Sequence, residues 1–127
     1  MKPPCMIMAS AILPAIRVSI AQKLAHSGTR PGRIATLMGI TPAAVTQYLS
    51  GARGREWTGR LTSIDIIAKE LDDLAEGLMN PDVDQTSTIQ KICNICRIVR
   101  SEGLLCDAHA STLPGLNTSN CGICRAP

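Results

Sequence analysis

Aromatic side chains are nearly absent from this chain, which narrows the folds open to it. Among 127 residues, only Tyr48 and Trp57 are aromatic, although 45% of the residues are hydrophobic. The strands of β-sandwiches and barrels favour aromatic residues, so the composition argues against both folds. It also argues against a platform for single-stranded nucleic acid, which stacks bases on aromatic rings. The hydrophobic content is high enough to exclude a wholly disordered chain.

The charges divide the chain into a basic half and an acidic half. Residues 1–62 contain eight lysines and arginines against one acid, a balance of +7. Residues 63–127 contain five against nine, a balance of −4. A basic domain is the electrostatic footprint of a polyanion binder. We therefore expect a nucleic-acid partner for the first half, with a merely basic, solvated surface as the alternative.

Three stretches of the basic half carry apolar residues at helical spacing. The spacing predicts helices over about 13–26, 31–38 and 42–50. Gly39 is predicted to end the second helix, and Thr41 to cap the third, with proline in its first turn. Two short helices joined by such a turn make a helix-turn-helix.

Residues 31–51, PGRIATLMGITPAAVTQYLSG, resemble the helix-turn-helix of Cro/C1-type transcriptional regulators, the XRE family. The resemblance extends over 11–60, which is close to half of the chain. It implies that Ala35 is small so that the two helices can approach, and that Gly39 adopts the conformation of the turn. Many members carry a polar residue such as glutamine at the start of the first helix, where this chain has Pro31–Gly32.

The resemblance implies that the second helix of the pair enters the major groove of double-stranded DNA. Gln47 would pair with adenine, and the methyl groups of Ala43 and Thr46 would contact a thymine methyl. Hydroxyl and guanidinium groups around the motif are expected to contact phosphate: Arg33, Thr41, Ser50, Arg53, Arg55 and Arg60. The last three arginines are expected in a loop beyond the motif. The alternative is a helical hairpin with polar surface residues and no DNA partner.

Residues 62–79 show the clearest amphipathic pattern, with apolar residues spaced alternately three and four apart. Thr62 and Asp65 resemble a capping box, with Asp in place of the usual Glu. The helix would close the core of a DNA-binding domain over 1–79, and the alternative is that it also supplies a dimer seam. Its acidic outer face should point away from DNA. The polar stretch 80–88 has turn chemistry and is interpreted as a linker.

Five of the six cysteines lie in the last segment, 89–127, which we interpret as a metal-binding tail: Cys93, Cys96, Cys106, Cys121 and Cys124. Two Cys-x-x-Cys pairs are separated by 24 residues, and two such pairs can complete a tetrahedral site. The pattern predicts structural zinc, with an iron–sulfur cluster and a metal-free thiol switch as alternatives. His109 is a further candidate ligand.

A helix is also predicted over about 88–100, with Cys93 and Cys96 on its apolar face. Cysteine is often a small buried hydrophobic residue, which would explain this pair without a metal. Some archaeal regulators of the XRE type resemble the chain further, through Cys-x-x-Cys followed by a segment like Ser101–His109.

Together these patterns predict an all-α fold, in which a small helical bundle with a helix-turn-helix is followed by a helix and a cysteine-rich metal-binding tail. We expect a cytoplasmic homodimer that regulates transcription by sequence-specific DNA binding, with metal or redox sensing in the tail. The alternative is a protein-interaction module that docks on the transcription machinery without DNA specificity of its own. No set of base, nucleophile and oxyanion donors indicates an enzyme, and no small-molecule substrate is expected. The uncharged run from Pro3 to Ile16 is too short to span a membrane.

Overall fold

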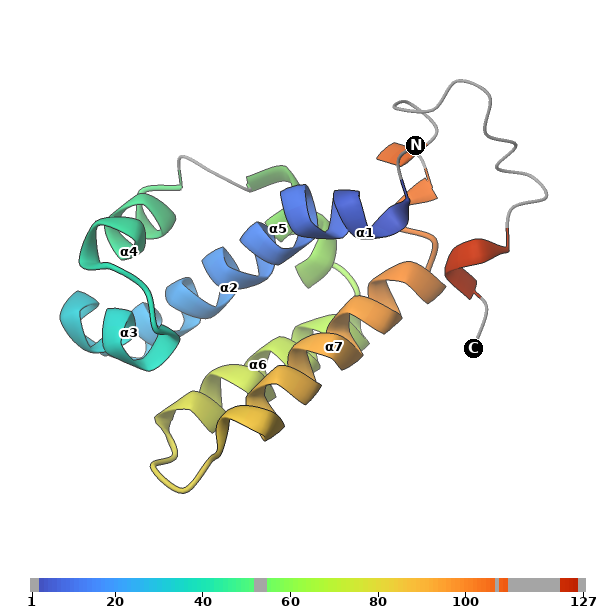
Figure 1. Ribbon diagram of the computed structural model, residues 1–127. Helices are drawn as coiled ribbons and strands as arrows, with labels where there is room; N and C mark the ends of the chain where they lie inside the picture. The colour runs from blue at the N-terminus through green and yellow to red at the C-terminus, as the bar shows by residue number, and fades with distance from the viewer. Residues whose placement is uncertain (1–2, 52–54, 107, 110–121, 126–127) are drawn as a thin grey trace.

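The computed structural model describes residues 3–51, 55–106, 108–109 and 122–125, and every regular element in these ranges is a helix (Figure 1). In chain order the elements are α1 (Pro4–Ile7), η1 (Met8–Ile12), α2 (Leu13–His26), α3 (Pro31–Met38), α4 (Pro42–Leu49), α5 (Arg55–Thr62), α6 (Asp65–Met79), α7 (Gln85–Ser101) and η2 (Ile123–Arg125). The prediction of an all-α fold is confirmed for this part of the chain.

The first three elements follow one another without a break from Pro4 to His26. The sequence predicts this helix only from about residue 13, and the structure extends it to Pro4. The reason is burial, since Ile7 and Ile12 both belong to the core. Pro14 does not end the helix because η1 is a wider π-helical turn, in which the Leu13 N–H donates to the Met8 carbonyl.

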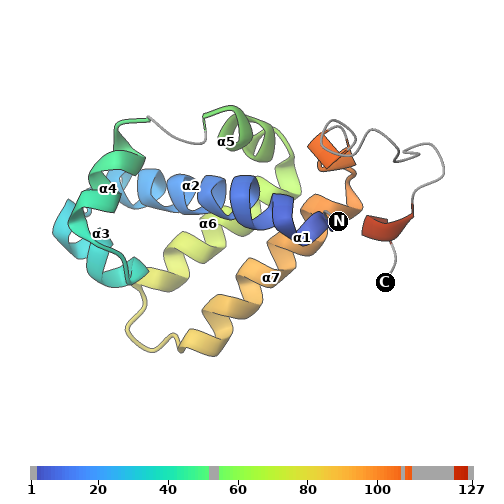
Figure 2. The ribbon, with the colours of Figure 1, turned by 45° about the horizontal axis from the view of Figure 1, so that its top comes forward.

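By length and composition alone, the helical stretch Pro4–His26 could cross a membrane. It has 23 residues and a mean hydropathy of 1.7 in its most apolar window, half of which is buried inside the protein. The uncharged run Pro3–Ile16 was too short for this, but the helix continues through Arg17 and Lys23. The core helix of a soluble protein and a signal sequence meet the same criterion. Here α2 contacts α3, α4, α5 and α6, so the stretch forms the centre of the bundle (Figure 2).

The helices α3 and α4 lie where the sequence predicts them, and they pack against one end of α2 (Figure 1). Gly39 ends α3 in the left-handed conformation, at φ +66°, which favours glycine. Beyond it the Ile40 N–H donates to the Ala35 carbonyl at 3.0 Å. The Thr41 hydroxyl caps α4 by accepting from the Ala44 N–H at 3.2 Å. Glycine and threonine thus fix the turn between the two helices.

The helix predicted over 62–79 begins later in the structure, at Asp65, as α6, and Thr62 instead ends the separate helix α5 before a break at Ser63–Ile64. The predicted capping box does not form, because the Thr62 hydroxyl donates to the Thr58 carbonyl at 2.9 Å within α5. Ile64 precedes α6 in an extended conformation and supplies no side-chain cap. The expectation of a loop at Arg55 and Arg60 is also wrong, because both lie in α5.

The apolar stripe of α6 is buried within the chain. Ile67, Leu71 and Leu74 are at most 2% exposed, and α6 packs against both α2 and α7. This helix therefore closes the core, as one of its two interpretations predicts. The stripe is not left open as a dimer seam.

The helix α7 packs alongside α6 and shares the same core (Figure 2). It begins at Gln85, where the Asp84 side chain accepts from the Ser87 N–H at 2.7 Å, so part of the stretch interpreted as a linker is helical. Ile95 and Val99 are fully buried and belong to the same apolar cluster as the residues of α2 and α6. The helix predicted over 88–100 is thus confirmed, and it joins the bundle.

Candidate nucleic-acid interface

One face of α4 is anchored in the core and the opposite face is open to solvent. Val45 is fully buried, and Tyr48 and Leu49 pack half-buried against the same cluster. Ala43 and Gln47 are exposed on the outer face. The remaining predicted contact residues of this motif are exposed as well: Thr41, Thr46 and Ser50. The structure therefore presents the predicted base-reading residues on one accessible helix.

The polar side chains of this face differ in their hydrogen bonds. The Thr46 hydroxyl donates to the Pro42 carbonyl at 3.1 Å, and the Ser50 hydroxyl donates to the Gln47 carbonyl at 2.8 Å. The Gln47 side-chain amide has no partner among the residues that the structure describes. Within this face, Gln47 is therefore the side chain whose donor and acceptor are both free for a ligand.

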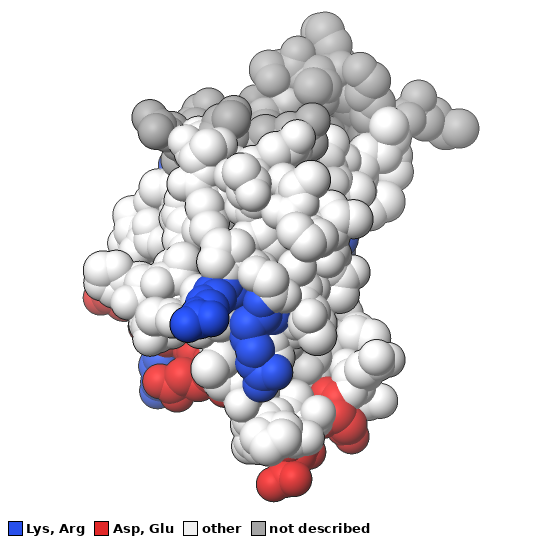
Figure 3. All heavy atoms as spheres, turned by 90° about the vertical axis from the view of Figure 1, so that its left-hand side faces the viewer, with Lys and Arg blue, Asp and Glu red and all other residues white. Residues whose placement is uncertain are grey.

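The basic residues of this end lie on α3 rather than on α4, which carries no charged residue. Arg33 is exposed in the first turn of α3, and Arg30 is exposed at its N-cap position. Figure 3 looks at the end of the molecule formed by α3 and α4. Lys and Arg side chains gather near its middle, with Asp and Glu side chains below them. Sequence reasoning did not include Arg30 in the site, although its place just before a predicted helix next to Arg33 was a usable signal.

The three arginines expected beyond the motif have different places. Arg53 lies outside the described residues, and of Arg55 the structure describes only the backbone, at the start of α5. Arg60 is half-buried in α5, with its guanidinium carbon 4.2 Å from the centre of the Trp57 ring. Its Nη2 also donates to the Leu104 carbonyl at 3.4 Å. Arg60 thus holds α5 to the segment after α7.

The structure describes four of the five predicted metal-ligating cysteines. Cys93 is exposed on α7, whereas Cys96, Cys106 and Cys124 are half-buried. Cys121 lies outside the described residues. Within the part of the chain that is described, no three His, Cys, Asp or Glu side chains come together to hold a metal ion. His109 is buried, at 5% exposure.

The surroundings of Cys96 disfavour its ionisation. Burial raises the pKa of the Cys96 thiol above its ordinary value, and the neighbouring Cys93 raises it further. Arg100, one turn along α7, partly opposes this rise. Cys96 is therefore held as the protonated thiol, with little of the reactive thiolate.

Comparison with protein-family models, curated proteins and solved structures finds no match for this chain.

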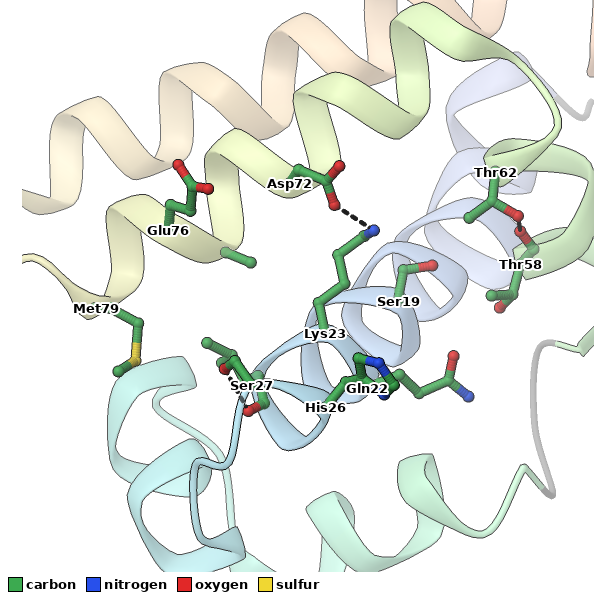
Figure 4. Close-up of a pocket in the computed structure, with 12 residues that line it drawn as sticks. Ser19, Gln22, Lys23, His26, Ser27, Thr58, Thr62, Asp72, Glu76 and Met79 are labelled. Atoms are coloured by element: carbon green, nitrogen blue, oxygen red, sulfur yellow. Dashed lines mark hydrogen bonds and ion pairs between the residues drawn. The ribbon is translucent and has the colours of Figure 1, made fainter.

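Sequence reasoning missed a pocket between α2, α5 and α6 (Figure 4). Its lining includes Ser19 and Lys23 from α2, Thr58 from α5 and Asp72 from α6. No sequence signal could have found it, because its residues are far apart in the chain. Only the packing of the three helices brings them together.

Proposed function

We propose that this chain is a DNA-binding transcriptional regulator that uses α3 and α4 as a helix-turn-helix. The observation that carries the proposal is the two-sided character of α4. Val45 anchors one side in the core, and the free amide of Gln47 projects from the other. A helix anchored in this way can enter the major groove without disturbing the rest of the bundle.

The chemistry of the exposed residues supports specific roles. Gln47 reads adenine through two hydrogen bonds, and Ala43 and Thr46 offer methyl groups to thymine. Arg33, with Arg30 beside it, neutralises the phosphate backbone next to the groove. The balance of +7 over residues 1–62 supports this assignment, because affinity for DNA rests largely on phosphate neutralisation.

The regulator acts as a homodimer in this proposal. One short helix reads only a few base pairs, so two copies bind half-sites that are one helical turn apart. Because the apolar stripe of α6 is buried within one chain, the contact between copies lies on another surface.

Substitution of Gln47 tests the base-reading role. Gln47→Ala removes both hydrogen bonds to adenine, so we expect it to weaken binding to the preferred duplex by about 1–3 kcal/mol. The matched control is Gln90→Ala, which changes the same residue type at an exposed position on α7. A duplex is first selected from a randomised pool, and its affinity for both variants is then measured by fluorescence anisotropy at one fixed salt concentration.

Two outcomes would count against the proposal in different ways. If the two variants bind every duplex with equal affinity, Gln47 does not read bases. If selection enriches no duplex and binding is nonetheless found for a transcription protein, the chain is an interaction module. The uncharged outer face of α4 favours this second candidate, since protein interfaces have few charges at their centre.

We also propose that the paired cysteines of the tail bind zinc, with an iron–sulfur cluster as the alternative. Zinc would be held by the two pairs Cys93/Cys96 and Cys121/Cys124, and the support for this is their Cys-x-x-Cys spacing. Cys106 is a further candidate ligand for a cluster. A bound metal would stabilise a tail that is too short to bury much apolar surface.

Metal content after purification without oxygen tests this second proposal. We expect a colourless protein with stoichiometric zinc, which Cys121→Ser depletes and Cys5→Ser leaves unchanged. Cys5 is a suitable control because it is exposed on α1, outside the paired motifs. A brown protein that contains iron would show that the cysteines bind an iron–sulfur cluster and not zinc. If the protein contains neither zinc nor iron, both metal assignments are wrong and the thiol switch remains.

A further inference from the structure

Helix α5 has little intrinsic stability of its own. It is eight residues long, and isolated helices of this length are not stable in water. Gly59 lies inside it, at an exposed position where an added Cβ atom would meet no described atom within 4 Å. Glycine in a helix is less stable than alanine, and no close approach to the described residues requires it here. The position of α5 therefore depends on its contacts with the rest of the bundle.

The contact between α5 and α2 leaves two hydroxyl groups unsatisfied. Ser19 Oγ on α2 and Thr58 Oγ1 on α5 are buried without a hydrogen-bond partner in the described part of the chain. Ser19 is only 2% exposed, and its hydroxyl points from α2 toward Thr58 (Figure 4). A buried hydroxyl without a partner destabilises the state that buries it, because water pairs with the same group once it is exposed. Both hydroxyls therefore favour a state in which α5 has moved off α2.

Two side chains of α5 oppose this movement. Leu61 is fully buried in the apolar cluster, so separation of α5 would expose it to water. Arg60 stacks on Trp57, and its Nη2 donates to the Leu104 carbonyl at 3.4 Å. This hydrogen bond ties α5 to the segment that follows α7.

The carbonyl that accepts from Arg60 lies in a turn next to a candidate metal ligand. Gly103 enters this turn at φ +74°, and the Leu104 N–H donates to the Val99 carbonyl at 3.3 Å. Leu105 follows and is fully buried, and Cys106 after it is half-buried. A change that displaces this turn therefore also displaces the acceptor of Arg60.

We propose that α5 is a strap that opens from α2, and that Arg60 is the latch that holds it to the turn after α7. The open state is a minor population, in which water reaches Ser19 and Thr58 while α2 and α6 stay folded. A displacement of the turn releases Arg60 and raises this population. The strap thus links the cysteine-rich tail to the part of the chain that follows the helix-turn-helix. Its opening does not depend on DNA binding.

Hydrogen exchange of the full chain, followed by NMR without DNA, tests the opening. The Ser63 N–H donates to the Gly59 carbonyl at 3.1 Å, so its exchange reports on α5. We expect protection factors for Leu61 and Ser63 at least about tenfold lower than for buried residues of α2 and α6 such as Ile20 and Leu71. Equal protection in the three helices would overturn the strap, because they would then open only together.

Removal of an unpaired hydroxyl should hold the strap closed. Ser19→Ala and Thr58→Val should each raise the protection of α5 by about fivefold or more, because the closed state no longer buries an unpaired group. The control is Ser63→Ala, which removes a hydroxyl that donates to the Arg60 carbonyl at 2.7 Å and should not raise protection. The hydroxyls would have no part in the opening if neither variant protects α5 more than this control.

Removal of the latch should have the opposite effect. Arg60→Met keeps an unbranched side chain and removes the donor, so we expect about three- to tenfold lower protection of α5, the effect of one hydrogen bond. Arg97→Met is the control, because Arg97 is exposed and its Nη1 donates to Asn94 within α7 at 3.2 Å. Equal protection of α5 in the two variants would show that Arg60 is not the latch.

A change in the turn tests whether the tail acts through Arg60. Gly103→Ala strains the left-handed backbone at this position, so it should lower the protection of α5 in the otherwise unchanged chain. In the Arg60→Met background it should have no further effect, because the latch is already absent. If Gly103→Ala lowers the protection of α5 by the same factor in both backgrounds, the turn does not control the strap through Arg60.

Discussion

Polar residues on the exposed face of α4 differ in whether the helix itself satisfies their hydrogen-bonding groups. The hydroxyls of Thr46 and Ser50 donate hydrogen bonds to backbone carbonyls of α4, whereas the Gln47 side-chain amide makes no such bond within the described chain. Arg60 shows the opposite case, because its guanidinium already stacks on Trp57, three residues before it on α5. The roles of individual side chains therefore depend on neighbours that composition does not reveal.

Alkylation of the two cysteines on α7 should follow their burial. Because burial raises the pKa of Cys96, this thiol carries less thiolate at neutral pH, and we expect iodoacetamide to label the exposed Cys93 first. Labelling of Cys96 should rise as the pH approaches its raised pKa. Mass spectrometry of peptides from samples quenched over a pH series measures both rates in the metal-free protein.

The same pKa shift predicts the direction of a stability change. The folded state keeps its proton on Cys96 at pH values where the unfolded chain has lost it, so the contribution to stability is complete below the unfolded pKa. It is lost as the pH rises through the folded pKa. Equal labelling rates for the two thiols in the folded protein, as in a urea-unfolded control, would contradict this account.

At the scale of helices, local signals predicted some boundaries and missed others. The ends of α3 and α4 were predictable because Gly39 and Thr41 act through their own backbone and side-chain geometry. The boundary at Ser63–Ile64 was not, because Thr62 bonds backward into α5 instead of forward to α6. The helical character of 55–62 depends on tertiary contacts, among them the full burial of Leu61. Hydrophobic spacing therefore located the apolar faces better than it located the breaks between them.

The candidate interface and the pocket illustrate the same limit. The exposed residues of α4 follow from one local helix, so Gln47 and Thr46 could be named from the sequence. The pocket combines Ser19, Thr58 and Asp72 from three helices, and no spacing along the chain relates them. Such a site becomes visible only when the packing of α2, α5 and α6 is known.

At the scale of the molecule, one apolar cluster connects the basic half to α7. Ile95 and Val99 lie in the same cluster as Ile12, Val45 and Leu71. A Cβ atom added at Gly77 in α6 would lie 3.0 Å from the Nζ atom of Lys91 in α7, so the two helices approach closely at this point. The bundle and α7 should therefore unfold together.

Substitution of a buried isoleucine on α7 tests this cooperativity. Ile95→Ala should lower the free energy of unfolding by about 2–5 kcal/mol, because Ile95 is fully buried. Ile89→Ala is the matched control on the same helix, since Ile89 is 59% exposed, and it should change stability by at most about 0.5 kcal/mol. Trp57 fluorescence in α5 reports on the bundle and circular dichroism on all helices. Separate transitions by these two probes, or a Trp57 transition that Ile95→Ala does not move, would contradict a single cooperative unit.

The π-helical turn at Met8–Ile12 has a consequence for changes in chain length. A π turn holds one residue more than the regular helix around it, and Ile7 before the turn and Ile16 after it are both buried. Deletion of one residue between 8 and 12 would convert the turn to regular α-helix and keep the two flanking segments in phase. An insertion at the same place would rotate everything before it away from the core. Length variation at this point is therefore tolerated in one direction only.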